Sequence, residues 1–467
     1  MGIGALNYQG VKGGLKLNDV IEEFKYVYQG QTIKAGDFVE YVKGIASQTV
    51  ETSSDVTLST ESHRGYTISA IQLDESRVFI VHSTSTQENT NLYGMIVTIN
   101  GTNMTVATDI ELISGARNYC VSMVKLDDKR VFIAYAYGGT AFLYGVVATI
   151  NGTTISTGTG LQLNTTNATG QKVSLQLLPS GKVFLAYRYG NDYRLYGMII
   201  TINGETITKG IDTKLNSSGY SGYELSTQLL PNGNVFIAHS NNSSGYYLYG
   251  LVVTISGTTI TSSGSSTSLN TTEYAGIRIS TQLLPNGNVF IAHSRDDDYH
   301  LYGMIVTISG TTVTKGTDYA ISSTAYTGYV ISTQLLPNGN VFIAHSYGSN
   351  YYLYGIIAII NGTAVTKGTD TLISNTTYAG KIISSIFLPN GSIFVAHSYG
   401  DYHYLHAQIF GIDETNNIPT NIVTLTEYEQ QAKLATKPPF NGIALSNGTG
   451  GTATAHNQQV KIARPNV

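Results

Sequence analysis

The chain has 467 residues, of which 42% are hydrophobic, 12% are charged and none is tryptophan, and its formal net charge is −4. Its 26 lysines and arginines are spread thinly, so no basic surface for nucleic acid or for an anionic membrane is expected. Fifty glycines and 34 tyrosines among many Thr, Val and Ile residues are typical of an all-β protein with many tight turns.

The first 45 residues do not match the repeat that fills most of the chain. Residues 17–24 are expected to form a short helix, because Asn18 can cap it and three apolar side chains would share one face. Residues 26–42 alternate in polarity and turn at two glycines, which predicts two strands. The chain starts with neither a basic segment nor an apolar run, and no window reaches the roughly 20 apolar residues of a membrane span, so folding in a cytoplasm is expected.

From about residue 46 to residue 426 the chain is a repeat. Its cleanest copy reads ISTQLLPNGNVFIAHS at 331–346, then a variable loop, then LYGIIAIINGT at 353–363. A period near 50 residues that is built of strands and stops at seven copies predicts a closed ring of blades, a seven-bladed β-propeller. The leucine of the Leu-Tyr-Gly element recurs 51 to 53 residues apart, at Leu92, Leu143, Leu195, Leu248, Leu301, Leu353 and, in the altered form Leu-His-Ala, Leu405.

Each copy is expected to form one blade of four antiparallel strands, named a to d in chain order. In the second copy these are residues 120–126, 131–136, 143–150 and about 153–163. The a–b connection is Pro-Asn-Gly or Asp-Asp-Lys, and the c–d connection is Asn-Gly or Ser-Gly, where Asn and Gly tolerate a positive φ. The many Asn-Gly-Thr sequences are therefore interpreted as hairpin turns and not as glycosylation signals.

The last blade must take its outer strand from one of two segments. Residues 49–61 align with the strand d that precedes every later strand a, and this exchange would lock the first blade to the last. Residues 418–426 follow strand c of the last copy directly and have the spacing of a strand d. The N-terminal segment is favoured.

The two ends outside the repeat carry a resemblance. Because the start and the end of a closed ring lie close together, residues 1–45 and 427–467 are expected to form one small β domain into which the propeller is inserted. The segments GDFVEYV (36–42), GIALSNGTGG (442–451) and VKI (460–462) resemble the small β-barrel pattern of phage virion proteins, notably capsid-decorating ones, although that pattern ends in two valines where this chain has VKI. With its His-Ser and Leu-Tyr-Gly blades and the ending GTGGTATAH (448–456), the whole chain also resembles repeat proteins of phages and prophages of Gram-positive gut bacteria.

The resemblance implies a structural protein of the virion surface that is made in the host cytoplasm. Capsid decoration is the first hypothesis, with the major capsid protein or another virion protein as partner, and a tail-associated receptor-binding adhesin is the second. Small docking domains of this kind are often homo-oligomeric. The residues expected to dock are Asp37, Phe38, Val39, Ile443 and Leu445.

Strand parity predicts where a ligand would bind. In an a-b-c-d blade the b–c and d–a loops lie on one face, and the b–c loops differ between copies and are rich in Tyr, Asn, Asp and Ser. This mixture suits a glycan or a protein surface, so binding of host-surface or mucosal glycans is expected there. The alternative is that these loops are solvated turns whose tyrosines pack over the blades. The candidate ligand-binding residues are Tyr137, Tyr189, Asp192, Tyr193, Tyr246, Tyr247, Asp297, Tyr299, Tyr347, Tyr351, Tyr399 and Tyr402.

No metal or other cofactor is expected. A column of histidines on strand b lies about two strand spacings from the axis, too far for several rings to converge on one metal ion, so each is interpreted as a structural hydrogen-bond donor. The run 296–298 of three aspartates lacks the spacing of a calcium loop. The column consists of His82, His239, His293, His345 and His397, with Tyr135 and Tyr187 in the two remaining copies.

The sequence gives little support for an enzyme. Glu224 is the one acid near the start of a strand a, and a glycosidase would need two carboxylates, so a propeller glycosidase or lyase is the weakest hypothesis. The single cysteine, Cys120, occupies a slot that other copies fill with Lys172, Glu224, Arg278 or Val330, and it is interpreted as incidental.

Overall fold

The computed structural model describes residues 20–26, 32–33, 38–84, 90–191, 193–216, 218–241, 245–413, 416–434, 442–444, 448–449 and 459–465. Every regular element in these ranges is a β-strand, so the all-β prediction is confirmed. These ranges contain no helix with the length and hydrophobicity needed to cross a bilayer. The chain divides into two compact units, one made of Met1–Glu51 and Thr424–Val467 and the other of Thr52–Val423.

Strands from both ends of the chain share one sheet in the terminal unit. Its order is β1 (Val20–Tyr26), β41 (Gln459–Pro465), β39 (Gly442–Ala444), β3 (Phe38–Thr52) and β38 (Ile422–Leu434), and β2 (Thr32–Ile33) pairs separately with β40 (Gly448–Thr449). The helix expected over residues 17–24 is wrong in its described part. β1 pairs antiparallel with β41 along its whole length, and these tertiary hydrogen bonds outweigh the weak helix preference of a short segment.

Two of the expected docking segments are neighbours in this sheet. β3 pairs with β39 so that Phe38 lies opposite Ile443 and Val39 lies opposite Gly442. Asp37 and Leu445 lie outside the described residues.

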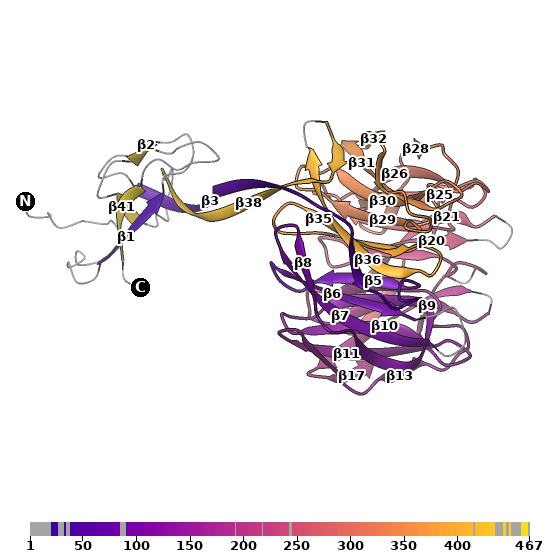
Figure 1. The fold of residues 1–467 in the computed structure, drawn as a ribbon. Coiled ribbons are helices and arrows are strands. Elements are labelled where there is room, and N and C mark those ends of the chain that lie inside the picture. The colour runs from indigo at the N-terminus through magenta and orange to yellow at the C-terminus, as the bar shows by residue number, and fades with distance from the viewer. Residues whose placement is uncertain are drawn as a thin grey trace, which may run out of the picture. The chain divides into compact units, whose positions relative to one another are not determined.

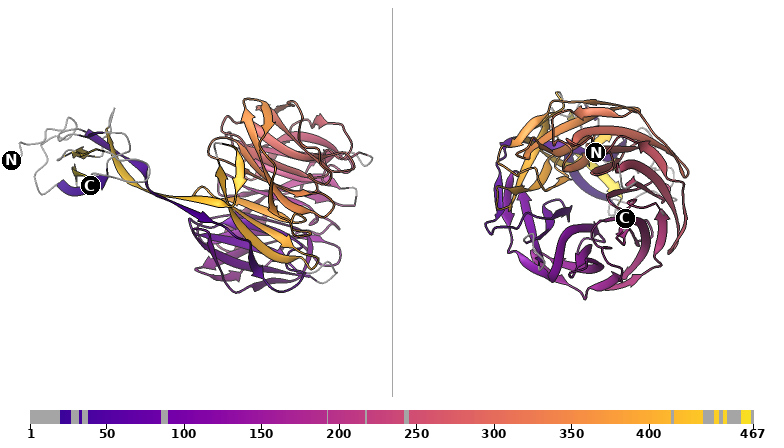
Figure 2. Two further views of the ribbon diagram at one scale, coloured as in Figure 1. Left: turned by 45° about the horizontal axis from the view of Figure 1, so that its top comes forward. Right: turned by 90° about the vertical axis from the view of Figure 1, so that its right-hand side faces the viewer.

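The unit Thr52–Val423 is a β-propeller, and Figure 2 (right) shows its sheets following one another in chain order around an axis (Figure 1). Inner strands of successive sheets lie beside one another in the order β5 (Ile68–Gln72), β9 (Ile110–Lys125), β14 (Val173–Leu177), β19 (Leu225–Leu229), β24 (Ile279–Leu283), β29 (Ile331–Leu335) and β34 (Ile383–Phe387). β34 lies beside β5 again. The inner strands therefore close a ring.

The sheets have one strand plan. Four copies give five-stranded sheets, with the following strands: β14 (Val173–Leu177), β15 (Val183–Tyr189), β16 (Arg194–Asn203), β17 (Thr206–Lys209) and β18 (Thr213–Asn216); β19 (Leu225–Leu229), β20 (Val235–Asn241), β21 (Tyr247–Ser256), β22 (Thr259–Ser263) and β23 (Thr267–Asn270); β24 (Ile279–Leu283), β25 (Val289–Arg295), β26 (His300–Ser309), β27 (Thr312–Thr314) and β28 (Tyr319–Ser322); β29 (Ile331–Leu335), β30 (Val341–Tyr347), β31 (Tyr352–Asn361), β32 (Ala364–Lys367) and β33 (Thr371–Ser374).

The first two copies share a nine-stranded sheet because β9 continues from the outer edge of one into the inner strand of the next. Its strands are β5 (Ile68–Gln72), β6 (Arg77–Ser83), β7 (Thr90–Asn100), β8 (Asn103–Val106), β9 (Ile110–Lys125), β10 (Arg130–Tyr137), β11 (Phe142–Asn151), β12 (Thr154–Thr157) and β13 (Leu161–Asn164).

The single strand d that the sequence predicts needs correction, because it is two short strands. In the second copy β12 pairs with the end of β11 and β13 pairs with its start, and the register shifts between Leu143 and Tyr144. The chain passes close to strand c at this break: a Cβ on Gly316, in the corresponding break of another copy, would overlap Ile305 O. The residue that follows this break faces the histidine column, as described below.

Both candidate segments complete the last sheet. Its strands are β34 (Ile383–Phe387), β35 (Ile393–Tyr399), β36 (Tyr404–Asp413), β37 (Ile418–Thr420) and β4 (Val56–Ser59). β37 pairs with residues 411–413 of β36, and β4 pairs with residues 405–407. Because strand d is split, the C-terminal segment supplies its first half and the N-terminal segment its second, and the indigo and yellow ends of the propeller meet in Figure 2.

The core lies between the sheets. The Val-Phe-Ile-Ala run of β20 is fully buried on both faces: Val235 and Ile237 pack with the preceding sheet, and Phe236 and Ala238 pack with the following one. Burying one such phenylalanine stabilises the fold by roughly 1.5–3 kcal/mol. The prediction that each blade has two apolar faces is confirmed.

The Ser-Thr-Gln part of the repeat joins the inner strands. Gln228 Nε2 donates to Thr281 O at 2.7 Å and Ser226 Oγ lies 2.8 Å from Thr281 Oγ1, and the neighbouring copies repeat both bonds. At the closing seam Ala70 N donates to Ser384 Oγ at 3.0 Å. The most regular stretch of the sequence is thus the polar belt that ties one blade to the next.

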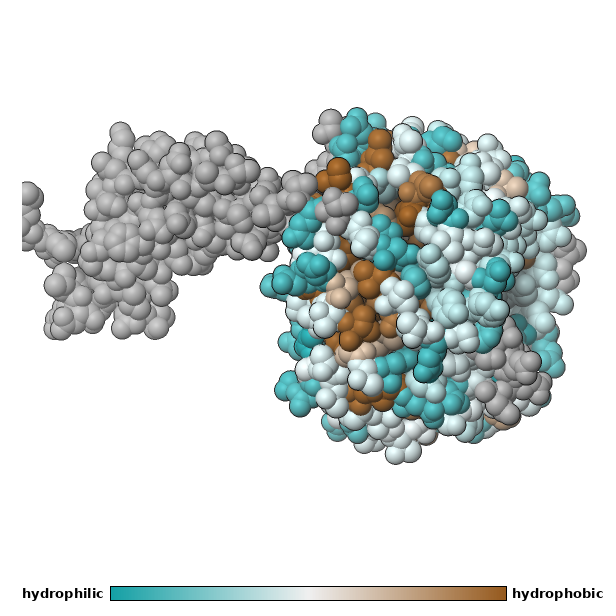
Figure 3. All heavy atoms as spheres, in the orientation of Figure 1, coloured by the Kyte–Doolittle hydropathy of each residue, from teal (hydrophilic) through white to brown (hydrophobic). Residues whose placement is uncertain are grey.

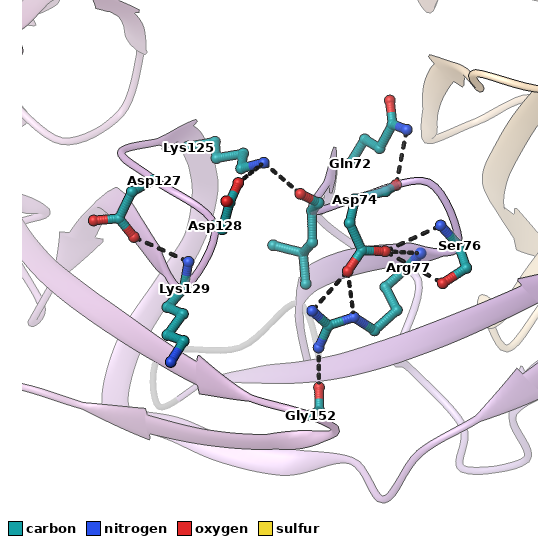
Figure 4. A network of polar contacts seen from close by, with 10 residues as sticks. Gln72, Asp74, Ser76, Arg77, Lys125, Asp127, Asp128, Lys129 and Gly152 are labelled. Atoms are coloured by element: carbon teal, nitrogen blue, oxygen red, sulfur yellow. Dashed lines mark hydrogen bonds and ion pairs between the residues drawn. The ribbon is translucent and has the colours of Figure 1, made fainter. Parts of the chain in front are cut away.

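The face with the a–b and c–d turns is also tied across blades. Figure 4 shows Asp74 accepting from Ser76 and Arg77, while the Arg77 guanidinium reaches Gly152 O in the c–d turn of the next copy. Lys125 similarly donates to Leu73 O.

On the side of the propeller unit shown in Figure 3, the described side chains are mostly hydrophilic or intermediate, and hydrophobic ones gather in a band. One cavity of about 310 Å³, lined by Leu372, Phe410 and Pro419 among others, lies at the outer edges of the last two sheets.

Candidate functional site: an aromatic arc around an axial cavity

The b–c and d–a loops lie on one face, as strand parity predicts, because they are hydrogen-bonded to each other. Gly276 N in a d–a loop donates to Tyr246 O in a b–c loop at 2.6 Å, and a Cβ on Gly276 would lie 2.5 Å from Tyr247 O. The corresponding bonds run from Gly222 to Tyr193 O, from Gly328 to Tyr299 O, from Gly380 to Tyr351 O and from Gly65 to His403 O. Only glycine fits where the two loops cross, so their relative position is fixed.

Bulky residues occupy left-handed backbone positions in both loops. In the b–c loops these are Tyr193, Tyr246, Tyr299, Tyr351 and His403, with φ between 45° and 56°, and in the d–a loops they are Tyr220, Tyr274, Tyr326, Tyr378 and His63, with φ between 62° and 69°. A non-glycine residue in such a conformation costs of order 1–3 kcal/mol. The second copy has Ala141 and Ala168 instead, so the turns themselves do not require an aromatic ring.

These rings form a continuous arc on the loop face. Neighbouring ring centroids in the set are 4.4 to 6.5 Å apart. Most of the rings are half-buried, whereas Tyr402 is 59% exposed and His403 is 5% exposed. We call the set the aromatic arc; its members are Tyr193, Tyr220, Tyr223, Tyr246, Tyr274, Tyr299, Tyr326, Tyr329, Tyr351, Tyr378, His403, Tyr66, His63 and Tyr402.

The arc adjoins a cavity at the ring axis. The cavity has a volume of about 310 Å³, and its lining comes from the residues at or just before the starts of inner strands of successive copies. Tyr329 belongs both to the lining and to the arc. The lining residues are Lys172, Glu224, Arg278, Ile279, Tyr329, Val330, Ile331, Lys381 and Ile382.

Three cations and one carboxylate share this cavity. Lys172 Nζ lies 2.7 Å from Glu224 Oε2, and Arg278 Nη1 lies 3.7 Å from the same oxygen. Arg278 also donates from Nε to Tyr329 O at 2.8 Å and from Nη1 to Ile277 O at 2.9 Å. The Lys381 Nζ atom lies 4.7 Å from the Tyr378 ring centroid and 5.9 Å from that of Tyr351.

The ionisation states of the arc follow from burial. Burial and the neighbouring tyrosine hydroxyls raise the pKa of Tyr246 and Tyr351, and burial raises the pKa of Tyr299 against the opposing charge of Arg278. Burial and the charges of Lys381 and His63 lower the pKa of His403 to about 4. At neutral pH Tyr246, Tyr299 and Tyr351 therefore keep their hydroxyl protons, and the His403 ring is uncharged.

The structure separates the expected ligand-binding residues into two groups. Tyr193, Tyr246, Tyr299, Tyr351 and Tyr402 belong to the aromatic arc. A second group stacks on strand c, as in the pairs Tyr189 with Tyr196 and Tyr347 with Tyr354, each with centroids 4.1 Å apart, and in Tyr137 with Tyr144 and Tyr399 with His406. Three expected residues belong to neither group. Asp297 is exposed, and the Tyr247 ring lies against Gly245, where a Cβ would overlap it. Asp192 lies outside the described residues.

Sequence reasoning missed the d–a half of the arc. Tyr274, Tyr326 and Tyr378 recur at the repeat period in Thr-Glu-Tyr-Ala-Gly, Thr-Ala-Tyr-Thr-Gly and Thr-Thr-Tyr-Ala-Gly. Strand parity places the d–a loops on the binding face. The tyrosine that recurs two residues before each crossing glycine could therefore have been predicted as a binding residue. Lys172, Glu224 and Arg278 share one slot of the repeat, but the sequence did not indicate that the residues of this slot line a common cavity.

Each histidine of the column makes a structural hydrogen bond, as predicted. The Nε2 atoms of His82, His293, His345 and His397 lie 2.9 to 3.3 Å from an aspartate that follows the break in strand d, and His239 meets Ser266 Oγ at 2.8 Å. Tyr187 donates to Asp212 in the same place. In the remaining copy the partner position is Gly160, where a Cβ would lie 2.9 Å from the Tyr135 hydroxyl.

The described residues contain no group of three or more His, Cys, Asp and Glu side chains placed to hold a metal ion. Burial raises the pKa of the Cys120 thiol, whose Sγ lies 3.8 Å from Val173 O, so this thiol is not activated as a nucleophile.

No family model matches this chain, and no curated protein matches it. The solved structures similar to it are β-propellers of low sequence identity. The BP39L lectin from Burkholderia pseudomallei has a TM-score of 0.59 at 9% identity over 77% of this chain and 100% of its own. A protein from Bacteroides fragilis proposed to be a 6-phosphogluconolactonase has a TM-score of 0.55 at 10% identity over 77% and 99%, and a protein from Lactobacillus plantarum has 0.53 at 11% over 77% and 98%. At these identities the likeness concerns the fold, which is that of a β-propeller.

Proposed function

We propose that the chain is a glycan-binding, non-enzymatic propeller of seven blades, inserted into a terminal docking unit and displayed on a phage virion. The observation that carries the glycan proposal is the aromatic arc. A tyrosine ring offers a flat apolar face to the C–H face of a sugar and a hydroxyl to its polar groups, and a ring held at a strained backbone position needs a reason beyond the turn. The lectin among the similar folds is compatible with this function.

The length of the arc favours an extended or clustered ligand. Tyr246, Tyr299 and Tyr351 occupy the same position in three successive copies, so several sugar units can be bound by equivalent rings. Repeated weak contacts of this kind gain affinity from multivalency.

The surroundings of Glu224 support the absence of catalysis. Its carboxyl group lies between Lys172 and Arg278 and is the one acid among the residues that line the cavity, whereas a glycosidase needs two carboxyl groups.

The virion location rests on the resemblance of the two ends, with capsid decoration preferred and a tail adhesin as the alternative. Segments that carry the resemblance lie side by side as β3 and β39. Cryo-electron microscopy of the virion with an antibody to the propeller tests this location: density regularly arranged on the capsid is expected, and density confined to the tail would support the adhesin.

Glycan binding is tested with the full chain on a glycan array. Replacing Tyr246, Tyr299 and Tyr351 with Asn removes three rings but suits the left-handed backbone, so we expect a folded protein that loses binding. Tyr352→Asn is the matched control, since Tyr352 is adjacent to Tyr351 but outside the arc, and it should retain binding. Full binding by the triple variant would refute the proposal.

A further inference from the structure

We propose that the axial cavity binds the carboxylate of an acidic sugar, so that the ligand of the arc is an acidic glycan. This inference rests on the proposed glycan-binding function and goes further, since the arc alone does not discriminate acidic from neutral sugars.

The charge balance of the cavity points to an anion. Lys172, Arg278 and Lys381 outnumber the single acid, Glu224, in a chain whose overall net charge is −4. A local positive charge in a negatively charged protein is not a consequence of composition. Low-dielectric walls strengthen its attraction for an anion.

The lysines of the cavity have different roles. Lys172 Nζ lies within 3.0 Å of both Glu224 oxygens. Lys172 is therefore paired with Glu224 and holds this side chain in place. Lys381 Nζ, in contrast, forms no ion pair or hydrogen bond with the described residues and contacts only the Tyr351 and Tyr378 rings, and its side chain is half-buried. Its ammonium is therefore available to pair with a ligand.

Arg278 is fixed in place and keeps one edge for a ligand. Its Nε and Nη1 atoms donate to the main-chain oxygens of Tyr329 and Ile277, and Nη1 also faces Glu224. Nη2 donates to no acceptor in the described part of the chain. A guanidinium held rigidly in this way is suited to a planar carboxylate.

Two rings of the arc lie between these cations. Arg278 Cζ is 5.2 Å from the Tyr329 centroid, Tyr329 is 4.8 Å from Tyr351, and Tyr351 is 5.9 Å from Lys381 Nζ. A sugar stacked on Tyr329 or Tyr351 would thus carry its acidic group toward Lys381 or Arg278. The cavity volume of about 310 Å³ lies at the lower end of the range for ligand pockets, which suits one sugar unit.

The test compares acidic glycans with their neutral parents. The full chain is applied to an array of uronic-acid oligosaccharides, the same oligosaccharides after carboxyl reduction, and sulfated forms. We expect the carboxylated forms to bind at least about tenfold more tightly than the reduced ones, with a preference that weakens as ionic strength rises. Sulfated glycans bound in preference to carboxylated ones would contradict the carboxylate assignment.

The variant Lys381→Met keeps most of the side chain and removes the charge. We expect it to lose most of the preference for carboxylated glycans while its binding of neutral ones is unchanged, and Lys129→Met, an exposed lysine on the opposite face, is the control. Equal binding of acidic and neutral forms, or no effect of Lys381→Met, would overturn the inference and leave the proposed function standing. An array with no bound glycan would refute both.

Discussion

His293 Nε2 lies 2.9 Å from Asp318 Oδ1, and its Nδ1 lies 2.7 Å from Ser294 O, with the ring fully buried. Both ring nitrogens of His293 therefore lie within hydrogen-bond distance of an oxygen atom. In the preceding copy the partner is a hydroxyl: His239 donates from Nδ1 to Ser240 O and can accept from Ser266 at Nε2. One repeat position thus has a carboxylate as the partner of its histidine in one blade and a hydroxyl in the next.

This difference predicts an acid-sensitive blade. Burial lowers the pKa of His239 to about 4 from an ordinary 6.5, so between these values the unfolded chain binds the proton more readily and stability falls as pH falls. The loss attributable to His239 is about 3 kcal/mol at most. Ser266→Asp should place a carboxylate beside His239, as in the other copies, and remove this part of the loss, whereas Ser266→Ala should keep it. Urea unfolding of the three proteins at pH 7 and pH 5 measures the difference, and identical pH slopes would contradict the prediction.

The Tyr135 blade offers a double-mutant cycle. Gly160→Asp alone should destabilise the protein by about 1–3 kcal/mol, because its Cβ would lie 2.9 Å from the hydroxyl of Tyr135, a buried side chain. Adding Tyr135→His makes the His–Asp pair of the other copies and should recover most of the loss. The cycle is read from thermal or urea unfolding, and purely additive effects would show that the two positions do not interact.

The repeat made much of this architecture predictable, because every copy constrains the same strand plan. The period indicated blades, and parity placed the b–c and d–a loops on one face. Contacts between copies were not predictable in this way: Lys172, Glu224 and Arg278 meet only because the ring brings three strand starts to one axis. The helix prediction at residues 17–24 failed for the same reason, since the partner of β1 lies more than 430 residues away in sequence.

The crossing of the b–c and d–a loops should tolerate no side chain. Gly276→Ala places a Cβ 2.5 Å from Tyr247 O and 2.7 Å from Tyr246 O, so one loop must move. We expect a loss of about 1–3 kcal/mol in unfolding free energy and weaker glycan binding, because Tyr246 and Tyr274 would separate. Gly139→Ala, whose Cβ would meet only Arg117 at 3.5 Å, is the control. Unchanged stability of Gly276→Ala would show that the loops are not held as described.

Asp55 should be the polar link that closes the ring. It precedes β4, the N-terminal strand that completes the last sheet, and its Oδ1 lies 3.3 Å from both His397 Nε2 and His406 Nδ1. Burial opposes ionisation of this carboxyl, but the hydrogen bonds from His397 and His406 outweigh it and hold its pKa well below the ordinary 3.8. Its stabilisation is therefore present above pH 3.8 and is lost as the pH falls through the lower, folded value.

Asp55→Asn should lower the unfolding free energy by about 1.5–3 kcal/mol at neutral pH, as expected for a lost charged hydrogen bond. The effect should be localised, since the first and last blades lose a shared contact while the central blades keep theirs. Hydrogen exchange should accordingly speed up in β4 and β36 before it does in β20 or β25, whereas uniform acceleration would indicate that closure does not depend on this residue. Thr57→Val, which removes the 3.2 Å contact of Thr57 Oγ1 with His406 Nε2 but leaves the carboxylate, is the matched control and should change stability by less than Asp55→Asn.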